Sequence, residues 1–230
     1  MFQILAVMEV QMKILRDNKY LNQIEDFWNE RSTTFDADHD TEDLEIWKSE
    51  LNRFIDKEKK VILDLGCGTG FLTNMLSELG HLVIGVDILT EMMKIGLEKT
   101  NNKSLKACYM KADVIDLPFI DESVDVIVNA RLIWTILEPV KAMQEWSRVL
   151  KKDGKLLCFN RMKEGFGLNT ETNVYEGEIE SKLKLKTIEN EKLINIIKNN
   201  GFSDVKIKKI KEITFECFDY DPWFVVIAKK

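Results

Sequence analysis

A glycine-rich turn near residue 66 has the residue types and spacing that a ligand site needs. Residues 61–70 read Val-Ile-Leu-Asp-Leu-Gly-Cys-Gly-Thr-Gly, so an apolar run and an acid lead into glycines at positions 66, 68 and 70. Glycine accepts positive φ and lets a ligand lie against bare backbone. Residues 71–79 follow as a helix-forming segment. This pattern is typical of a nucleoside-type cofactor site at the carboxyl edge of a parallel sheet.

Two acids follow later strand-like runs and could complete that site. Asp87 lies 17 positions past Gly70. An acid there can accept hydrogen bonds from ribose hydroxyls, with the neighbouring Ile88 against one face of adenine. Asp113 is placed to accept from the adenine amino group, and the backbone of Val114 could contact the ring edge. The alternatives are a helix cap at Asp87 and a local turn at Asp113.

A nicotinamide-binding loop is the main rival interpretation. Its fingerprint is Gly-x-Gly-x-x-Gly, in which the third glycine allows close packing of helix on strand. Counted from Gly66, that third position is Phe71, so the pattern is broken. An ordinary strand-to-helix turn without a ligand is the other alternative.

The elements that position these residues alternate between strands and helices from residue 59 onward. The expected strands are Lys60–Leu65, Leu82–Asp87, Leu105–Lys111, Val124–Ala130 and Lys155–Asn160. The expected helices are Phe71–Leu79, Glu91–Lys99, Val140–Leu150 and Glu191–Asn199. Continuous apolar strands separated by helices predict a parallel sheet covered on both faces. Right-handed crossovers then place the loops after the strands on one edge.

The two ends of the chain depart from this alternation. Val205–Ile210 and Trp223–Ala228 are expected to pair as an antiparallel hairpin. Residues 1–55 read as two or three amphipathic helices and predict an N-terminal lid before a main domain of residues 56–230. Residues 161–188 could form a segment that covers the substrate.

In combination, these segments resemble the class I S-adenosylmethionine-dependent methyltransferases. The closest branch is the small-molecule type 11 group, which includes ubiquinone and menaquinone methylases. The resemblance covers about residues 59–160 and includes Glu-Trp-Ser-Arg-Val-Leu-Lys-Lys-Asp-Gly-Lys-Leu-Leu at positions 145–157. It implies an α/β, Rossmann-like doubly wound fold with a mostly parallel seven-stranded sheet and an antiparallel C-terminal hairpin.

The same resemblance implies S-adenosylmethionine as cofactor and S-adenosylhomocysteine as product. The residues that it assigns to the cofactor are Asp64, Gly66, Cys67, Gly68, Gly70, Asp87, Ile88, Asp113, Val114 and Asn129. A further likeness lies in residues 131–139, which look like an Arg-x-x-Trp-Thr-Leu-x-x-Pro variant of uncharacterised bacterial and archaeal members.

The substrate side offers few chemical groups. His39 could act as a base, or be a solvated surface histidine. Arg131 could bind a carboxylate of substrate or cofactor, or pair with a surface acid. Trp28, Phe35 and Trp134 could wall an apolar pocket or serve in core packing. No catalytic residue is assigned, because methyl transfer mainly requires alignment and exclusion of water.

Composition limits the remaining possibilities. A net charge of −6 over 230 residues disfavours a general affinity for nucleic acid. The four cysteines are far apart and only two histidines occur, so no metal site is expected. Buried, reduced thiols at Cys108, Cys158 and Cys217 fit a cytoplasmic protein. The apolar N-terminus lacks the features of a secretory signal or a membrane span, and Met8 and Met12 are alternative starts.

The expected function is therefore methylation of a small molecule. Asn129 is followed by Ala-Arg-Leu, so the Asn-Pro-Pro-Tyr type motif of amino-methylating enzymes that act on nucleic acid or protein glutamine is missing. Two alternatives remain open: a non-catalytic sensor or partner subunit that binds the cofactor, and a protein-directed methyltransferase. The sequence identifies neither the acceptor atom nor the oligomeric state.

Overall fold

Seven strands form one mixed sheet in the computed structural model, which describes residues 19–37, 42–161, 174–210, 213 and 222–230. The strand order is β3-β2-β1-β4-β5-β7-β6. The strands are β1 Val61–Leu65, β2 Leu82–Asp87, β3 Ala107–Lys111, β4 Val124–Ala130, β5 Leu150–Arg161, β6 Ser203–Ile210 and β7 Trp223–Lys229. Strands β1 to β5 pair in parallel, and β7 lies antiparallel between β5 and β6. The predicted fold class and C-terminal hairpin are confirmed.

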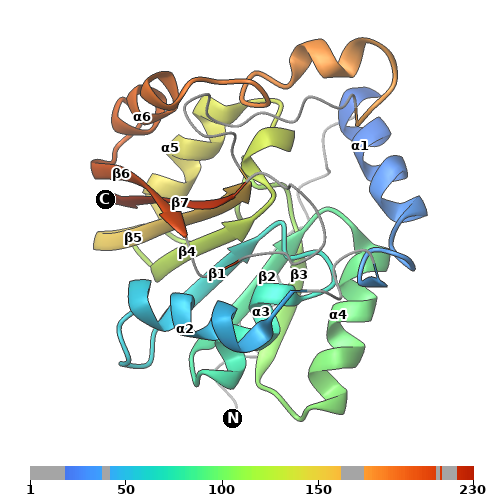
Figure 1. Ribbon diagram of the computed structural model, residues 1–230, viewed down its shortest axis with the longest axis vertical. Helices are drawn as coiled ribbons and strands as arrows, with labels where there is room; N and C mark the ends of the chain where they lie inside the picture. The colour runs from blue at the N-terminus through green and yellow to red at the C-terminus, as the bar shows by residue number, and fades with distance from the viewer. Residues whose placement is uncertain (1–18, 38–41, 162–173, 211–212, 214–221) are drawn as a thin grey trace.

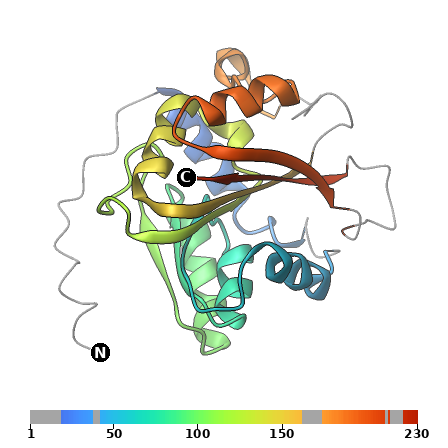
Figure 2. The same ribbon diagram turned by 90° about the vertical axis from the view of Figure 1, so that its left-hand side faces the viewer.

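Helices cover both faces of this sheet (Figures 1 and 2). The α-helices are α1 Lys19–Glu30, α2 Leu44–Phe54, α3 Phe71–Glu78, α4 Thr90–Asn102, α5 Pro139–Val149 and α6 Asn190–Lys198. One core lies between the sheet and α5 and α6, around Trp146 and Leu193. The other lies between the sheet and α2 and α3, around Trp47 and Leu76. Apolar strands buried on both faces are the cause of this layered arrangement.

Strand β5 is longer than the sequence predicts. It begins at Leu150 rather than Lys155, because Leu150 already pairs with Val124 across an irregularity in the ladder with β4. A helix was expected to extend to Leu150, but α5 ends at Val149. The apolar character of Leu150 suits either element, so periodicity alone does not separate them.

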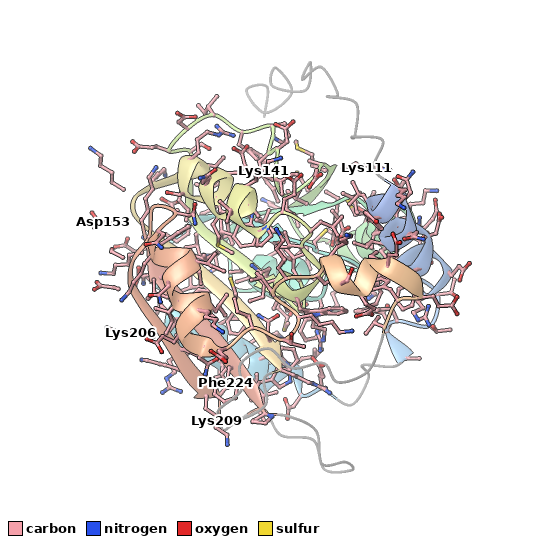
Figure 3. The ribbon with its side chains drawn as sticks, turned by 90° about the horizontal axis from the view of Figure 1, so that it is seen from above. Lys111, Lys141, Asp153, Lys206, Lys209 and Phe224 are labelled. Carbon is pink, nitrogen blue, oxygen red and sulfur yellow. The ribbon has the colours of Figure 1, made fainter. Side chains whose placement is uncertain are left out.

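The two edge strands explain the exposure of several side chains. Cys108 lies on edge strand β3 and is exposed, so the prediction that its thiol is buried is wrong. Cys217 lies outside the described residues. On the opposite edge, Figure 3 shows Lys206 and Lys209 of β6 at the rim of the molecule. Lysines on an edge strand disfavour pairing with the strand of another chain.

The N-terminal region contributes to two different parts of the molecule. Helix α1 packs beside the short 3-10 helix η4, Gly177–Lys182, through Ile24 and Ile179, and Figure 1 shows the two side by side. Helix α2 instead belongs to the sheet core, where Trp47 is fully buried. The predicted division at residues 55 and 56 stays a prediction. Within the described ranges, no helix is both long and apolar enough to cross a bilayer.

Candidate cofactor and acceptor site

The loop between β1 and α3 has a backbone that side chains would obstruct. Gly66, Gly68 and Gly70 all adopt positive φ, at 66°, 51° and 79°. The Gly66 amide donates to the carbonyl of Val86 at 2.8 Å, which holds the loop against the end of β2. A Cβ atom added at Gly66 would lie 2.7 Å from Cδ1 of Leu132. The loop therefore presents bare backbone at the carboxyl edge of the sheet.

Asp87 ties the end of β2 to this loop. Its Oδ2 accepts from the Gly68 amide at 2.8 Å, and its Oδ1 accepts from the Leu89 amide at 2.9 Å. The side chain is buried, and burial raises the pKa of Asp87 to about 6. Each carboxylate oxygen keeps a further lone pair, so both could accept from hydroxyl groups of a ligand.

Two adjoining cavities share Gly66, Asp87 and Ile88. The first continues toward Asp113 and Val114, the residues after β3. The second measures about 490 Å³ and extends toward the ends of β4 and β5. Further residues that line the second cavity are Gly68, Trp28, Phe35, Met92, Arg131, Trp134, Asn160, Arg161 and Val174. Because the two cavities share these residues, the strand ends open on one groove. Its first part is mainly apolar and contains Asp87 and Asp113, and its second part is lined by aromatic side chains.

Comparison with known sequences favours one interpretation of this groove. Residues 63–158 match a protein-family model described as a methyltransferase domain. This match supports the predicted resemblance to the class I S-adenosylmethionine-dependent methyltransferases of the type 11 group. It is similar to a demethylmenaquinone methyltransferase of Thermus thermophilus, at 33% identity over 131 residues, or 55% of this chain and 60% of that protein. The chain spans 38% to 60% of the length of the curated relatives that it matches.

Solved structures share the methyltransferase fold over most of the chain. A chain of the Haloferax volcanii complex between the Trm112 methyltransferase activator and a candidate methyltransferase gives a TM-score of 0.68 at 19% identity, covering 90% of this chain and 96% of that one. A Haemonchus contortus phosphoethanolamine N-methyltransferase in complex with phosphomonomethylethanolamine and S-adenosylhomocysteine gives 0.61 at 23% identity, covering 79% and 52%. At sequence identities of 19% and 23%, these similarities show a shared fold and no more.

The groove brings together most of the residues that the sequence singled out. The predicted residues that line it are Gly66, Gly68, Asp87, Ile88, Asp113, Val114, Trp28 and Arg131. Asp64, Cys67, Gly70 and Asn129 are not among its described lining residues. The Asn129 amide is fully buried and donates to Sγ of Cys158 at 3.2 Å. His39 lies outside the described residues. The ligand contacts of all these residues stay predictions.

Arg131 is more deeply enclosed than a surface ion pair would be. Its guanidinium donates to Oε1 of Glu42, a carboxylate with no exposed side-chain area. It lies 4.6 Å from the ring centroid of Trp223, and its backbone adopts a φ of 62°. Burial lowers the pKa of Arg131 to about 10, so the group stays charged at neutral pH. The acid that it pairs with is therefore buried rather than on the surface.

Aromatic side chains from distant segments wall the second cavity. The ring centroid of Trp28 lies 6.0 Å from that of Phe35 and 6.4 Å from that of Trp134. The Trp28 indole N–H donates to the Tyr175 hydroxyl at 2.8 Å, which joins α1 to the segment before η4. This contact depends on tertiary packing, and no sequence pattern predicts it. In the described ranges, no group of three or more His, Cys, Asp or Glu could hold a metal ion.

Two groove residues at the end of β5 are not among those that the sequence predicts. Asn160 and Arg161 both line the second cavity. The signal that could have found them is simple: polar residues that end an apolar strand lie at the same sheet edge as Asp87 and Arg131. Strand β5 was predicted to end at Asn160, which would have allowed that inference.

A buried acid below the glycine loop should make stability depend on pH. Asp64 accepts a hydrogen bond from Oγ1 of Thr73 at 2.6 Å, and burial raises the pKa of Asp64 to about 7. Because the folded-state pKa lies above the unfolded one, stability falls as pH rises toward 7. We expect Asp64→Asn to raise the free energy of unfolding, relative to the wild type, by about 2–3 kcal/mol more at pH 8 than at pH 5. The wild type loses this stability over the two pH units between pH 5 and the pKa of about 7. Urea unfolding of both proteins at the two pH values measures this, and an equal gain at both would contradict it.

Proposed function

We propose that this protein transfers a methyl group from S-adenosylmethionine to a small-molecule acceptor. The observation that carries the proposal is the continuous groove from Asp113, past bare backbone at Gly66, to the aromatic compartment around Trp134. A nucleoside with an extended side chain fits the first part of such a groove, and an acceptor fits the second. The match of residues 63–158 to a methyltransferase-domain model and the names of the curated relatives support the same reaction.

The residues present suit this cofactor. The Asp87 carboxylate can accept from both ribose hydroxyls while its oxygens keep their bonds to the Gly68 and Leu89 amides. Ile88 and Val114 offer apolar contact to an adenine ring, and Asp113 lies in the same cavity. A Cβ atom at Gly66 would overlap Leu132, so glycine at this position lets the Leu132 side chain pack against the loop at the groove floor.

The protein's own task is then to hold two molecules in line and keep water out. When bound, S-adenosylmethionine supplies an electrophilic methyl carbon, whose bond to sulfur breaks with the electron pair left on sulfur. Trp28, Phe35 and Trp134 enclose the compartment where the acceptor's lone pair would form the new bond. Arg131 is cationic at neutral pH, so it can position ligand groups but cannot accept a proton as a general base.

The cytoplasm is the proposed compartment. Cys67 and Cys158 are buried as free thiols, and reduced cysteines are usual there. Among the curated relatives, quinone precursors occur as methyl acceptors by name. The acceptor of this protein is proposed only as a small molecule with an apolar part, since that is what the aromatic compartment favours.

Labelled methyl transfer tests the function. The purified protein is incubated with methyl-labelled S-adenosylmethionine and, separately, with the small-molecule and protein fractions of a bacterial extract. We expect label in the small-molecule fraction, and less of it when Asp87→Ala replaces the wild type at a low cofactor concentration. Label in the protein fraction alone would favour a protein-directed enzyme. Cofactor binding without transfer to either fraction would favour a sensor or partner subunit.

A further inference from the structure

A single carboxylate joins the segment after α1 to the glycine loop. Oδ1 of Asp36 accepts a hydrogen bond from Oγ1 of Thr69 at 2.7 Å, and Oδ2 of Asp36 pairs with Nζ of Lys99 at 2.5 Å. The Lys99 ammonium also donates to the Thr69 carbonyl at 3.2 Å. Thr69 is 1% exposed and lies between Gly68 and Gly70. Asp36, Thr69 and Lys99 therefore connect three segments at one point, and we call this contact the Asp36 latch.

Residues 19–37, which we call the α1 strap, are also held at a second point. Glu25 of α1 accepts from Nζ of Lys111, the last residue of β3, at 3.0 Å, and Figure 3 shows Lys111 beside α1. The strap also contributes side chains to both cavities of the groove. These side chains are Leu21, Ile24, Trp28 and Phe35. One strap thus forms part of the wall around the cofactor position and around the acceptor compartment.

The proposed cofactor position is enclosed. Asp87, the proposed ribose contact, is 5% exposed, so a ligand group reaches it only if part of the groove wall moves. The strand ends are fixed by the sheet, whereas the strap is tied to the loop side by side chains that keep part of their area in water. Asp36 is 44% exposed and Lys99 is 37% exposed. Partly exposed ion pairs contribute little to stability, so this contact can break and form again readily.

We propose that Asp36 is a positioning residue that couples the α1 strap to the glycine loop, so that the strap closes over bound cofactor and opens to release it. Thr69 lies in the loop against which the cofactor is placed, so a shift of that loop on binding makes or breaks the latch. The latch also fixes Phe35, the next residue along the chain, whose ring lies 6.0 Å from that of Trp28. The acceptor compartment is then complete only when the strap is closed, and the acceptor binds after the cofactor. This inference rests on the proposed function, because it assigns the order of binding in that reaction.

Dissociation rates test the coupling. Binding of S-adenosylhomocysteine to the immobilised protein is followed by surface plasmon resonance. We expect Asp36→Ala and Thr69→Val each to raise the dissociation rate about fivefold or more, and Thr69→Ser to keep the wild-type rate because it retains the hydroxyl. The double variant should dissociate no faster than the faster single variant, since both changes remove the same contact. Lys94→Gln, which removes an exposed ion pair with Glu91 on the same helix α4, is the matched control and should leave the rate unchanged.

Ionic strength separates the ion pair from the hydrogen bond. Asp36→Asn keeps an acceptor for the Thr69 hydroxyl but loses the charge that attracts Lys99. Salt screens partly exposed charges, so the wild-type dissociation rate should rise about threefold between roughly 50 mM and roughly 500 mM sodium chloride. Asp36→Asn should show less than half of that rise. An equal rise in both proteins would overturn the assignment of the latch to the Asp36 charge.

Hydrogen exchange distinguishes coupling from a merely structural role. Coupling is reciprocal, so cofactor binding should slow amide exchange in the strap only as far as the latch transmits it. We expect S-adenosylhomocysteine to slow exchange in residues 19–37 about fivefold or more in the wild type, and by less than half as much in Asp36→Ala. Equal slowing in the two proteins, or an unchanged dissociation rate in Asp36→Ala, would overturn the proposal. Failure of the wild type to bind S-adenosylhomocysteine at all would instead contradict the proposed function.

Discussion

Asp87→Ala is expected to weaken S-adenosylhomocysteine binding by about 1–3 kcal/mol, or roughly 5- to 150-fold. We propose that the carboxylate accepts hydrogen bonds from the ribose hydroxyls, and it also fixes the loop through the Gly68 amide at 2.8 Å. Isothermal calorimetry of the wild type and the variant measures the loss. Circular dichroism checks that the variant is folded.

A control and a pH series distinguish this role from a general loss of stability. Asp121→Ala removes an exposed carboxylate that pairs with Arg148. This ion pair has no part in the groove, so the substitution should leave the affinity for S-adenosylhomocysteine unchanged. Because the pKa of Asp87 is about 6, its carboxyl takes up a proton as pH falls below 6 and then accepts less well. Wild-type affinity should therefore drop below pH 6, and Asp87→Ala should lack this drop. Unchanged affinity in the folded variant would refute the assignment.

Gly70→Ala should destabilise the protein by roughly 2–5 kcal/mol. Its φ is 79°, which costs an L-residue about 1–2 kcal/mol. The added Cβ would also overlap the Tyr109 hydroxyl and lie 3.2 Å from the Cα of Gly96, and such overpacking costs about 1–3 kcal/mol. Denaturant unfolding of variant and wild type gives the difference in unfolding free energy.

Gly80→Ala is the matched control for that substitution. Gly80 has a φ of 93°, but an added Cβ would meet no heavy atom within 4 Å. Gly80→Ala should cost about 1–2 kcal/mol, the conformational part alone. Adding Tyr109→Phe to Gly70→Ala removes the overlapping hydroxyl and should recover part of the loss in a double-mutant cycle. Equal costs at the two glycines, or no recovery, would show that packing around Gly70 is not the constraint.

Sequence reasoning succeeds here where the constraint is local. The turn after β1 requires positive φ and bare backbone, so glycines at 66, 68 and 70 are visible in the chain itself. Asp87 is likewise visible because it ends an apolar strand. Right-handed crossovers then bring these strand ends to one edge, so a single rule predicts both the sheet and the place of the groove.

The other features of the fold and the site depend on tertiary packing, which the spacing of residues in the sequence does not reveal. Glu42 and Arg131 are 89 residues apart, and neither their pairing nor its burial leaves a local pattern. The exposure of Cys108 follows from the position of β3 at the sheet edge, which the strand's own composition does not reveal. Trp28 meets Tyr175 only because α1 and the segment before η4 fold over the same groove.

Titration of the wild-type protein with S-adenosylhomocysteine, alongside a titration with NADH, tests the central claim most directly. The account predicts one binding site for S-adenosylhomocysteine, competition by 5′-methylthioadenosine, and no measurable affinity for NADH. NADH binding without S-adenosylhomocysteine binding would contradict it, because the groove between Asp87 and Gly66 would then hold a different nucleotide.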